Sequence, residues 1–402
     1  MTIFALSSGN GISGIAVIRI SGNEASSVIK LLTNKKLPVA RVATLRKINN
    51  INTSELIDEG IIIWFPGPKS YTGEDMAEIH VHGSKAVIQA LIKCISEIKN
   101  CKLAEPGEFT KKAFQNGKVN LLKAESIGDL IYSETEIQRK QAIKIIEGKS
   151  ERIFNDLREE LVKILSYVES KIDFPEEDLP KKILQEVKDT SEKTLNKIKK
   201  ILDDQKVGER IREGFKIAIV SESAGTTRDV IETHLNIDGY PVVMSDTAGI
   251  RDAKNEIEKK GIRLALKRAE EADLRLVVIE PKNLDFTGFL KDLFDENSIL
   301  VINKSDLKRF ELSEQLKKLD HVKISIKKNE NINELISKIK NKLKNKFITS
   351  DDVLITRERH RQHLESCMQY LLEFNKKCDE ESFDLAAEDL RLATRHLGMI
   401  IG

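Results

Sequence analysis

The feature of this 402-residue sequence that most constrains its fold is a change of pattern in its middle third. Between residues 206 and 348, short runs of apolar and β-branched residues alternate with helical stretches. The runs are residues 215–220, 240–245, 274–279 and 298–302. Strands that alternate with helices are typical of an α/β domain with a mostly parallel sheet. The sequence therefore predicts such a domain over residues 206–348.

The sequence on both sides of this domain has a helical pattern. The predicted helices are residues 125–147, 150–172 and 176–204 before the sheet, and 356–377 and 382–402 after it. Each is longer than an average globular helix. Since the helices resume after the sheet, the pattern predicts one helical domain, 118–205 and 349–402, with the α/β domain inserted into it.

The first 117 residues have a mixed pattern. Residues 14–20, 60–65 and 77–81 are predicted to be strands, and residues 84–99 carry the apolar stripe of a helix. This mixture predicts an α+β domain over residues 1–117. The chain is also too long for one compact core, so a multi-domain protein is expected.

One polar motif follows a predicted strand of the middle domain. Asp246, Thr247, Ala248 and Gly249 come directly after the apolar run PVVMS. Ligands bind at strand ends in open α/β sheets. A carboxylate there holds a magnesium ion through water, and glycine lets a backbone N–H approach a phosphate oxygen. Taken alone, these four residues fit a simple turn equally well.

A second motif, Asn303, Lys304, Ser305 and Asp306, follows the apolar run SILVI. A carboxylate accepts two hydrogen bonds side by side, which matches the adjacent N1–H and N2–H donors of guanine. Adenine offers no such pair, so Asp306 is expected to select guanine. The alternative is a solvated turn.

Two further motifs of the middle domain complete a set of four. Thr226 and Thr227 lie in the segment GTTRD, where a threonine hydroxyl suits a magnesium ion and a γ-phosphate. Ser325, Ile326 and Lys327 follow the last predicted strand, where a backbone amide meets the base. Four pieces in this order indicate a domain of GTPase type.

The phosphate-binding loop of such a domain is missing from the sequence. A GxxxxGK[ST] loop and a helix should follow the first strand, but Val220 leads directly into SESAGTTRD. Either an internal segment has been left out of this chain or the protein has lost it, and the intact motifs favour the first. Without that helix, apolar strand surface is expected to face water. The chain as it stands is expected to bind GTP poorly.

Composition and sequence pattern argue against several classes of protein. A net charge of +2 argues against a nucleic-acid binder that works by bulk electrostatics. The sparse cysteines, Cys94, Cys101, Cys367 and Cys378, form no CxxC pair and are expected to be reduced thiols. The N-terminus does not have the pattern of a signal peptide, and no apolar run approaches the ~18 residues needed to span a bilayer. A soluble, cytoplasmic protein without membrane contact is expected.

The motifs together resemble one family. GTTRDVIE and LNIDGYPVVMSDTAGIRD, with GIAVIRISG, GPKSYTGEDMAEIHVHG and AEPGEFTKKAFQNGKVNLLKAESIGDLI, are similar to the MnmE (TrmE) GTPases that modify tRNA. The resemblance covers nearly the whole chain. It implies a folate-binding N-terminal domain that dimerises, a discontinuous helical domain and an inserted Ras-like G domain.

The resemblance also implies roles in the G domain. Thr227 matches the magnesium threonine, while Ser221, Ser223 and Thr226 match the loop around a potassium ion that replaces an arginine finger. Glu258 matches the catalytic glutamate that positions the attacking water; alone it would be one carboxylate among several. The expected GTP contacts are Thr226, Thr227, Asp246, Thr247, Ala248, Gly249, Asn303, Lys304, Asp306, Ser325, Ile326 and Lys327.

The resemblance to this family also implies which reaction the protein catalyses. GTP hydrolysis is coupled to adding a carboxymethylaminomethyl group at C5 of the wobble uridine of tRNA. The protein works as a homodimer in complex with the flavoprotein MnmG, and 5-formyl- or methylene-tetrahydrofolate donates the carbon. Arg19, Glu78 and Lys118 match the folate contacts, and Arg19 is conspicuous as a charge within an apolar strand. Solvated charges are the alternative.

Two other functions remain open. The first is a degenerate, non-hydrolysing dimeric scaffold that binds folate or a partner. The second is a ribosome-assembly GTPase, which shares the G-domain motifs but lacks the N-terminal segments. Family members end in a Cys-x-Gly-Lys tail, whereas this chain ends in LGMIIG, so no catalytic role is transferred to Cys367 or Cys378. His80 and His82 alternate on one strand but lack an obvious third metal ligand, and His82 with Gly83 is expected to form a turn.

Overall fold

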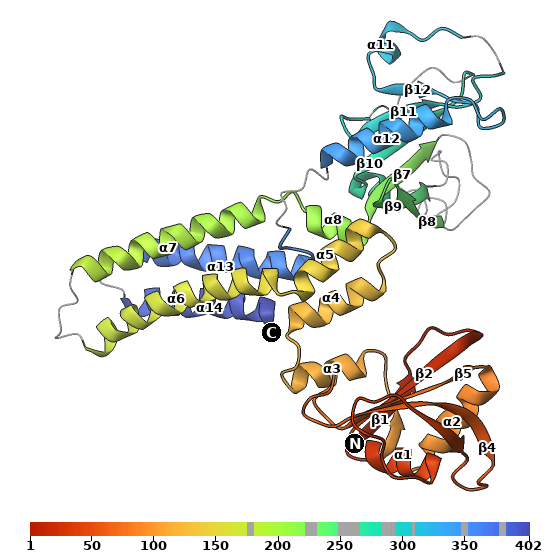
Figure 1. Ribbon diagram of the computed structural model, residues 1–402. Coiled ribbons are helices and arrows are strands. Elements are labelled where there is room, and N and C mark those ends of the chain that lie inside the picture. Colours follow the sequence, from red (N-terminus) through yellow and green to blue (C-terminus); the bar gives the residue numbers. More distant parts are fainter. Residues whose placement is uncertain are drawn as a thin grey trace, which may run out of the picture. The chain divides into compact units, whose positions relative to one another are not determined.

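The computed structural model describes residues 1–174, 181–221, 231–247, 266–282, 291, 294–307, 310–346, 353–377 and 383–402. The chain divides into two compact units, Met1–Ala124 and Glu125–Gly402 (Figure 1). Within the described ranges, no helix is both long and apolar enough to cross a membrane.

The first unit contains a six-stranded sheet in the order β3-β4-β5-β2-β1-β6. The β1 and β6 pair is parallel, and the other neighbouring strands are antiparallel. The strands are β1 (Thr2–Leu6), β2 (Ser13–Ser21), β3 (Thr44–Asn49), β4 (Leu56–Phe65), β5 (Met76–Gly83) and β6 (Cys101–Leu103). His82 and Gly83, which were expected in a turn, are therefore the last two residues of β5.

One face of this sheet forms the core of the first unit. Ile18, Ile62 and Ile79 point to this face and are fully buried. Helices α1 (Ala25–Thr33) and α2 (Lys85–Ser96) pack against them in the same hydrophobic cluster. Because side chains alternate along a strand, the residues between these apolar ones lie on the opposite face. The remaining helix of this unit, α3 (Glu108–Gln115), follows β6.

The second unit has seven helices outside its sheet region, as far as the structure describes it. They are α4 (Leu121–Ile131), α5 (Glu136–Ile146), α6 (Lys149–Asp173), α7 (Lys181–Leu202), α8 (Val207–Glu213), α13 (Glu358–Lys377) and α14 (Phe383–Ile401), the first of which starts in the first unit. Helices α6, α7, α13 and α14 run side by side, although α13 and α14 follow the sheet in sequence (Figure 1).

The single helix predicted over residues 125–147 is wrong, because the chain forms α4 and α5 instead. Thr135 has an extended backbone and caps α5, and its side chain accepts a hydrogen bond from the backbone N–H of Gln138. The Gln138 side chain accepts in return from the backbone N–H of Thr135, which completes a capping box. This local sequence stabilises a new helix start.

The sheet of the second unit has the order β12-β11-β10-β7-β9-β8. All neighbouring strands are parallel except β8, which is antiparallel to β9. The strands are β7 (Phe215–Ser221), β8 (Ile231–Ile237), β9 (Tyr240–Thr247), β10 (Leu274–Ile279), β11 (Ser298–Ile302) and β12 (His321–Lys323). The prediction of a mostly parallel sheet is confirmed, and β7 continues without a break through Val220 and Ser221.

Both faces of this sheet carry apolar side chains. On one face, Leu276 and Val301 cluster with Ile339 and Leu343 of helix α12 (Ile332–Lys346) and with residues of α8. On the other face, the cluster combines Val220, Val277 and Leu300 with Ala269, Leu312 and Leu316, the last in helix α11 (Glu314–Lys317). A parallel sheet needs such cover on both faces.

Candidate functional site

The carboxyl ends of the parallel strands meet at one edge of the sheet in the second unit. Asp246 pairs with Ile219 in register, close to the end of β7 at Ser221. Asn303 directly follows β11, and its backbone N–H donates to the carbonyl oxygen of Ile279 at 2.9 Å. The structure thus brings Ser221, Asp246 and Asn303 to the edge at which ligands bind in open α/β sheets.

Asp306 is oriented at this edge by a buried serine. The Ser325 hydroxyl donates to Asp306 Oδ1 at 2.7 Å, and Ser325 itself is fully buried. This hydrogen bond, assisted by the charges of Lys328 and Lys327, lowers the pKa of Asp306 from its ordinary value. An ionised carboxylate is a pure acceptor, which suits the paired N–H donors of guanine.

The loop that carries Asp306 is tied to its neighbours. The backbone N–H of Ser305 donates to the carbonyl oxygen of Ile324 at 3.1 Å. Lys304 has a left-handed backbone with φ of 60°, and its ammonium group pairs with Glu280. Ile326 is 67% exposed, and Lys327 is exposed beside it. These contacts hold the loop between the ends of β10 and β12.

Several predicted site residues lie outside the described ranges. For Thr247, only the backbone pairing in β9 is described. The predicted magnesium site, most of the potassium loop and the catalytic glutamate therefore stay predictions. The residues outside the described ranges are Ser223, Thr226, Thr227, Ala248, Gly249 and Glu258.

In the first unit, Arg19 and Glu78 form a pair on the face of the sheet opposite α1 and α2. Arg19 donates to Glu78 Oε1 from Nε at 3.0 Å and from Nη2 at 2.8 Å. The rings of Tyr71 and Phe109 lie 5.4 and 5.7 Å from the guanidinium carbon. The pair explains how a charge is accommodated in an apolar strand.

The third expected folate residue lies near the same loop as Tyr71. The side chain of Lys118 packs against Gly73 so closely that a Cβ there would lie 2.9 Å from Lys118 Cε. Tyr71 also shares a 2.8 Å hydrogen bond with Thr110. Sequence reasoning missed Tyr71, although it stands two residues before Gly73 within GPKSYTGED.

His80 and His82 have carboxylate partners. His80 Nε2 lies 3.5 Å from Glu78 Oε2, and His82 Nδ1 lies 2.9 Å from Asp58 Oδ1. Among the described residues, no group of three or more His, Cys, Asp or Glu side chains is arranged to hold a metal ion.

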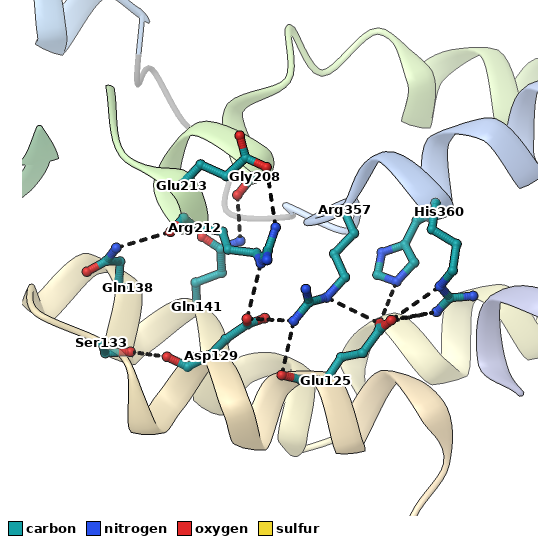
Figure 2. A network of polar contacts seen from close by, with 11 residues as sticks. Glu125, Asp129, Ser133, Gln138, Gln141, Gly208, Arg212, Glu213, Arg357 and His360 are labelled. Atoms are coloured by element: carbon teal, nitrogen blue, oxygen red, sulfur yellow. Dashed lines mark hydrogen bonds and ion pairs between the residues drawn. The ribbon is translucent and has the colours of Figure 1, made fainter. Parts of the chain in front are cut away.

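A network of charged side chains that sequence reasoning missed joins α4 to α13 (Figure 2). Glu125 accepts from Arg359 Nε at 3.2 Å and from Nη2 at 3.1 Å, and it lies 2.9 Å from His360 Nε2. Burial by itself would raise the pKa of Glu125, but the hydrogen bonds and charges of His360 and Arg359 outweigh it and lower that pKa. Arg359 also donates to the carbonyl oxygens of Met399 and Ile400 in α14.

The same network reaches α8, the helix that leads into β7. Asp129 Oδ1 accepts from Arg357 Nη2 at 2.6 Å and from Arg212 Nε at 3.2 Å (Figure 2). The Gln138 and Gln141 side chains donate to backbone carbonyl oxygens of α8. These bonds, together with the pairing of Arg361 with Glu209, fix the start of the sheet to the helices. A signal existed in the sequence, since Glu125 and Asp129 are four residues apart on one helix face.

A mostly parallel sheet whose carboxyl edge carries Asp246 and the Asn303–Asp306 motif indicates a protein of the GTPase class. Two family models match: the MnmE helical domain over residues 121–402, and the GTP-binding protein TrmE N-terminus over residues 2–118. The chain belongs to the MnmE family.

Individual relatives are similar along the whole chain. It is 68% identical to the tRNA modification GTPase MnmE of Pelagibacter ubique, over all of this chain and 96% of that protein. It is 40% identical to the protein of the same name from Rickettsia bellii, over all of this chain and 95% of that protein. A crystal structure of Aquifex aeolicus Era covers 39% of this chain and 66% of its own, with 22% identity and a TM-score of 0.28.

The length of the first of these alignments bears on the missing phosphate-binding loop. The alignment with the Pelagibacter protein extends over 424 positions, although this chain has 402 residues. That alignment therefore contains positions at which this chain has no residue. Such a gap agrees with the missing loop and helix.

Proposed function

We propose that this protein is a tRNA modification GTPase. The observation that carries the proposal is the 68% identity to a protein of that name over the whole of this chain. The N-terminal model match disfavours a ribosome-assembly GTPase, which would lack those segments. The relatives give no support to a degenerate scaffold.

The nucleotide site follows from the sheet edge. Asp306 reads guanine, and Asn303, Lys304, Ser325, Ile326 and Lys327 complete the base-binding loops. The phosphates would lie towards Asp246 at this edge, and the resemblance assigns the contacts with the γ-phosphate and Mg²⁺ to Thr226 and Thr227. The oriented carboxylate of Asp306 supports this arrangement. When bound, the magnesium ion neutralises charge on the phosphate oxygens.

The hydrolysis step is assigned by resemblance. Ser221, Ser223 and Thr226 would hold the potassium ion, and Glu258 would position the attacking water. These residues belong to an inserted G domain, which we assign to residues 206–348.

The modification site lies in the first unit. Arg19, Glu78 and Lys118 bind 5-formyl- or methylene-tetrahydrofolate, in a domain over residues 1–117 that forms the homodimer. The paired Arg19 and Glu78, with aromatic rings beside the guanidinium group, support a site for a flat, polar ring. The product is a carboxymethylaminomethyl group at C5 of the wobble uridine, made with MnmG in the cytoplasm. The helical domain comprises residues 118–205 and 349–402.

The decisive test combines tRNA modification with base selection. In cells that lack their own MnmE, this chain with its missing loop and helix restored should return the modified wobble uridine, measured by mass spectrometry of tRNA. Asp306→Asn in the restored chain should lower the preference for GTP over xanthosine triphosphate, because the amide presents a donor where guanine needs an acceptor. Restored protein that binds GTP but never yields modified tRNA would refute the proposal.

A further inference from the structure

The face of the first sheet that carries the Arg19–Glu78 pair also holds a histidine with an unused ring nitrogen. Glu78 and His80 are two residues apart on β5, so their side chains lie on the same face. His80 Nε2 is buried and forms no hydrogen bond with any residue that the structure describes. It lies 3.5 Å from Glu78 Oε2, which is longer than the usual hydrogen-bond range of about 2.7–3.2 Å. A buried polar atom without a partner is costly and calls for an explanation.

The neighbouring strands offer His80 no partner. In register, Val17 of β2 and Ile61 of β4 stand on either side of it. Both side chains are aliphatic and have no hydrogen-bonding atom. Ile61 is also 40% exposed, so apolar surface lies open beside the imidazole ring. The sheet therefore leaves Nε2 to be satisfied by a molecule that binds to this face.

Glu78 presents one carboxylate oxygen at the same place. Its Oε1 accepts both hydrogen bonds from Arg19, at 3.0 and 2.8 Å. No hydrogen bond from the described part of the chain reaches Oε2, although Arg19 holds the carboxylate in position. An ionised carboxylate oxygen is an acceptor, and an imidazole N–H is a donor. Glu78 Oε2 and His80 Nε2 therefore place an acceptor beside a donor.

This arrangement complements a ring in which an N–H group adjoins a carbonyl group. The pterin ring of a folate has such an edge, formed by its N3–H and the carbonyl group at C4. Glu78 would accept from the ring N–H, and His80, with its proton on Nε2, would donate to the carbonyl oxygen. The rings of Tyr71 and Phe109 beside Arg19 offer flat surface on which a fused ring can stack.

We infer that His80 binds the pterin ring of the folate directly, with Nε2 donating to the ring carbonyl oxygen while Glu78 Oε2 accepts from the adjacent N–H. The His80 side chain is 28% exposed, and the torsion that turns its ring is soft, so a rotation brings Nε2 towards the open face. The inference rests on the proposed folate site of the first unit and is independent of the nucleotide site.

The test measures the binding of 5-formyltetrahydrofolate to the full chain by isothermal titration calorimetry. His80→Phe keeps a flat ring but removes the donor, and it should weaken binding about tenfold or more. His80→Gln keeps an N–H donor and should bind within about threefold of the unchanged chain. His82→Phe is the matched control and should leave binding unchanged, because His82 is 74% exposed and pairs with Asp58. Circular dichroism confirms that each variant folds.

The outcomes separate the inference from the proposed folate site. Arg19→Met should abolish binding. If it does so while His80→Phe binds normally, the inference alone is overturned. An equal loss in His80→Gln, or in His82→Phe, would also overturn it.

Uridine monophosphate, whose ring has a similar edge, should not displace the folate at equal concentration, and displacement would overturn the assignment to pterin. A folded chain that binds no 5-formyltetrahydrofolate, or that binds it equally after Arg19→Met, would overturn the proposed folate site and the inference with it.

Discussion

The two six-stranded sheets of this protein differ in the face that lies opposite their main helical cover: it is polar in the first unit and apolar in the second. The sheet of the first unit is mostly antiparallel, and it buries one face under α1 and α2. Its other face holds polar partners such as the Arg19–Glu78 pair. The sheet of the second unit is mostly parallel and apolar on both faces. One of those faces contains an open apolar groove beside α12, whose lining includes Ile219, Met244 and Leu235.

The difference shows which sheet tolerates the loss of a covering element. Antiparallel strands alternate apolar and polar residues, so one face can meet water at little cost. Strands of a parallel sheet are apolar on both faces, and a missing helix leaves side chains such as Ile219 and Met244 partly exposed. The absence of a covering helix is therefore expected to expose more apolar surface in the parallel sheet than in the antiparallel one.

The largest expected effect comes from restoring the segment. Inserting the relative's loop and helix between Val220 and Ser221 should raise the affinity for magnesium GTP about a thousandfold, or about 4 kcal/mol, because loop amides then bind the phosphates. Isothermal titration calorimetry measures the change. A glycine-serine insert of the same length is the control. An equal gain from that insert would contradict the comparison.

Truncating the covered face of the first sheet should have the next largest effect. Ile62 is fully buried under the helices, so Ile62→Ala should cost about 3 kcal/mol in the free energy of unfolding of that unit. Urea denaturation followed by circular dichroism gives the value. Leu235→Ala in the open groove should cost less than about 1 kcal/mol. Similar costs at both sites would mean that the groove is closed in solution.

The polar face of the first sheet should respond to loss of a charge partner. Arg19→Met removes both hydrogen bonds to Glu78 and should cost about 1 kcal/mol, a value reduced because the pair is partly exposed to solvent. Thermal unfolding measures it. The double variant with Glu78→Gln should recover part of the loss, since no carboxylate then lacks its partner. An additive double variant would show that the two residues do not interact.

The smallest expected effect is a pH dependence at Asp58. Burial alone would raise its pKa, but hydrogen bonds from the backbone and side chain of His82 outweigh burial and lower the pKa from 3.8. A lowered folded pKa adds stability above pH 3.8 that is lost as pH falls through the folded value. Asp58→Asn should therefore cost under about 1 kcal/mol at pH 7 and almost nothing near pH 2. A constant cost across that range would contradict the assignment.

Apolar patterning was enough to predict most strands and long helices. The runs 274–279 and 298–302 coincide with β10 and β11, because buried parallel strands are continuously apolar. The strand β8 was missed because IETHLNI has only three apolar residues, with three consecutive polar ones between the first two, and its described side chains are mostly exposed. The break between α4 and α5 depends on a cap at one threonine, which periodicity does not reveal.

The candidate sites also differ in how well the sequence predicts them. The neighbourhood of Asp306 and Ser325 was predictable because both follow strands that end at one edge. The contact between Arg359 and Glu125 was not, because 234 residues separate the two in sequence. Only the packing of α13 beside α4 brings them together. Local order in the sequence thus predicts strand-end sites better than it predicts helix-to-helix networks.

The close approach of Gly208 to Ile355 has a consequence for protein engineering. A Cβ on Gly208 would lie 1.9 Å from the carbonyl oxygen of Ile355. The chain that leads into the sheet region and the chain that leaves it are therefore in contact. Excising everything between those points and bridging them with a short linker should leave α7 and α13 able to pair. The same adjacency brings the two ends of the inserted region together, so the residues between them should be expressible by themselves as a fragment that contains the GTPase-type sheet.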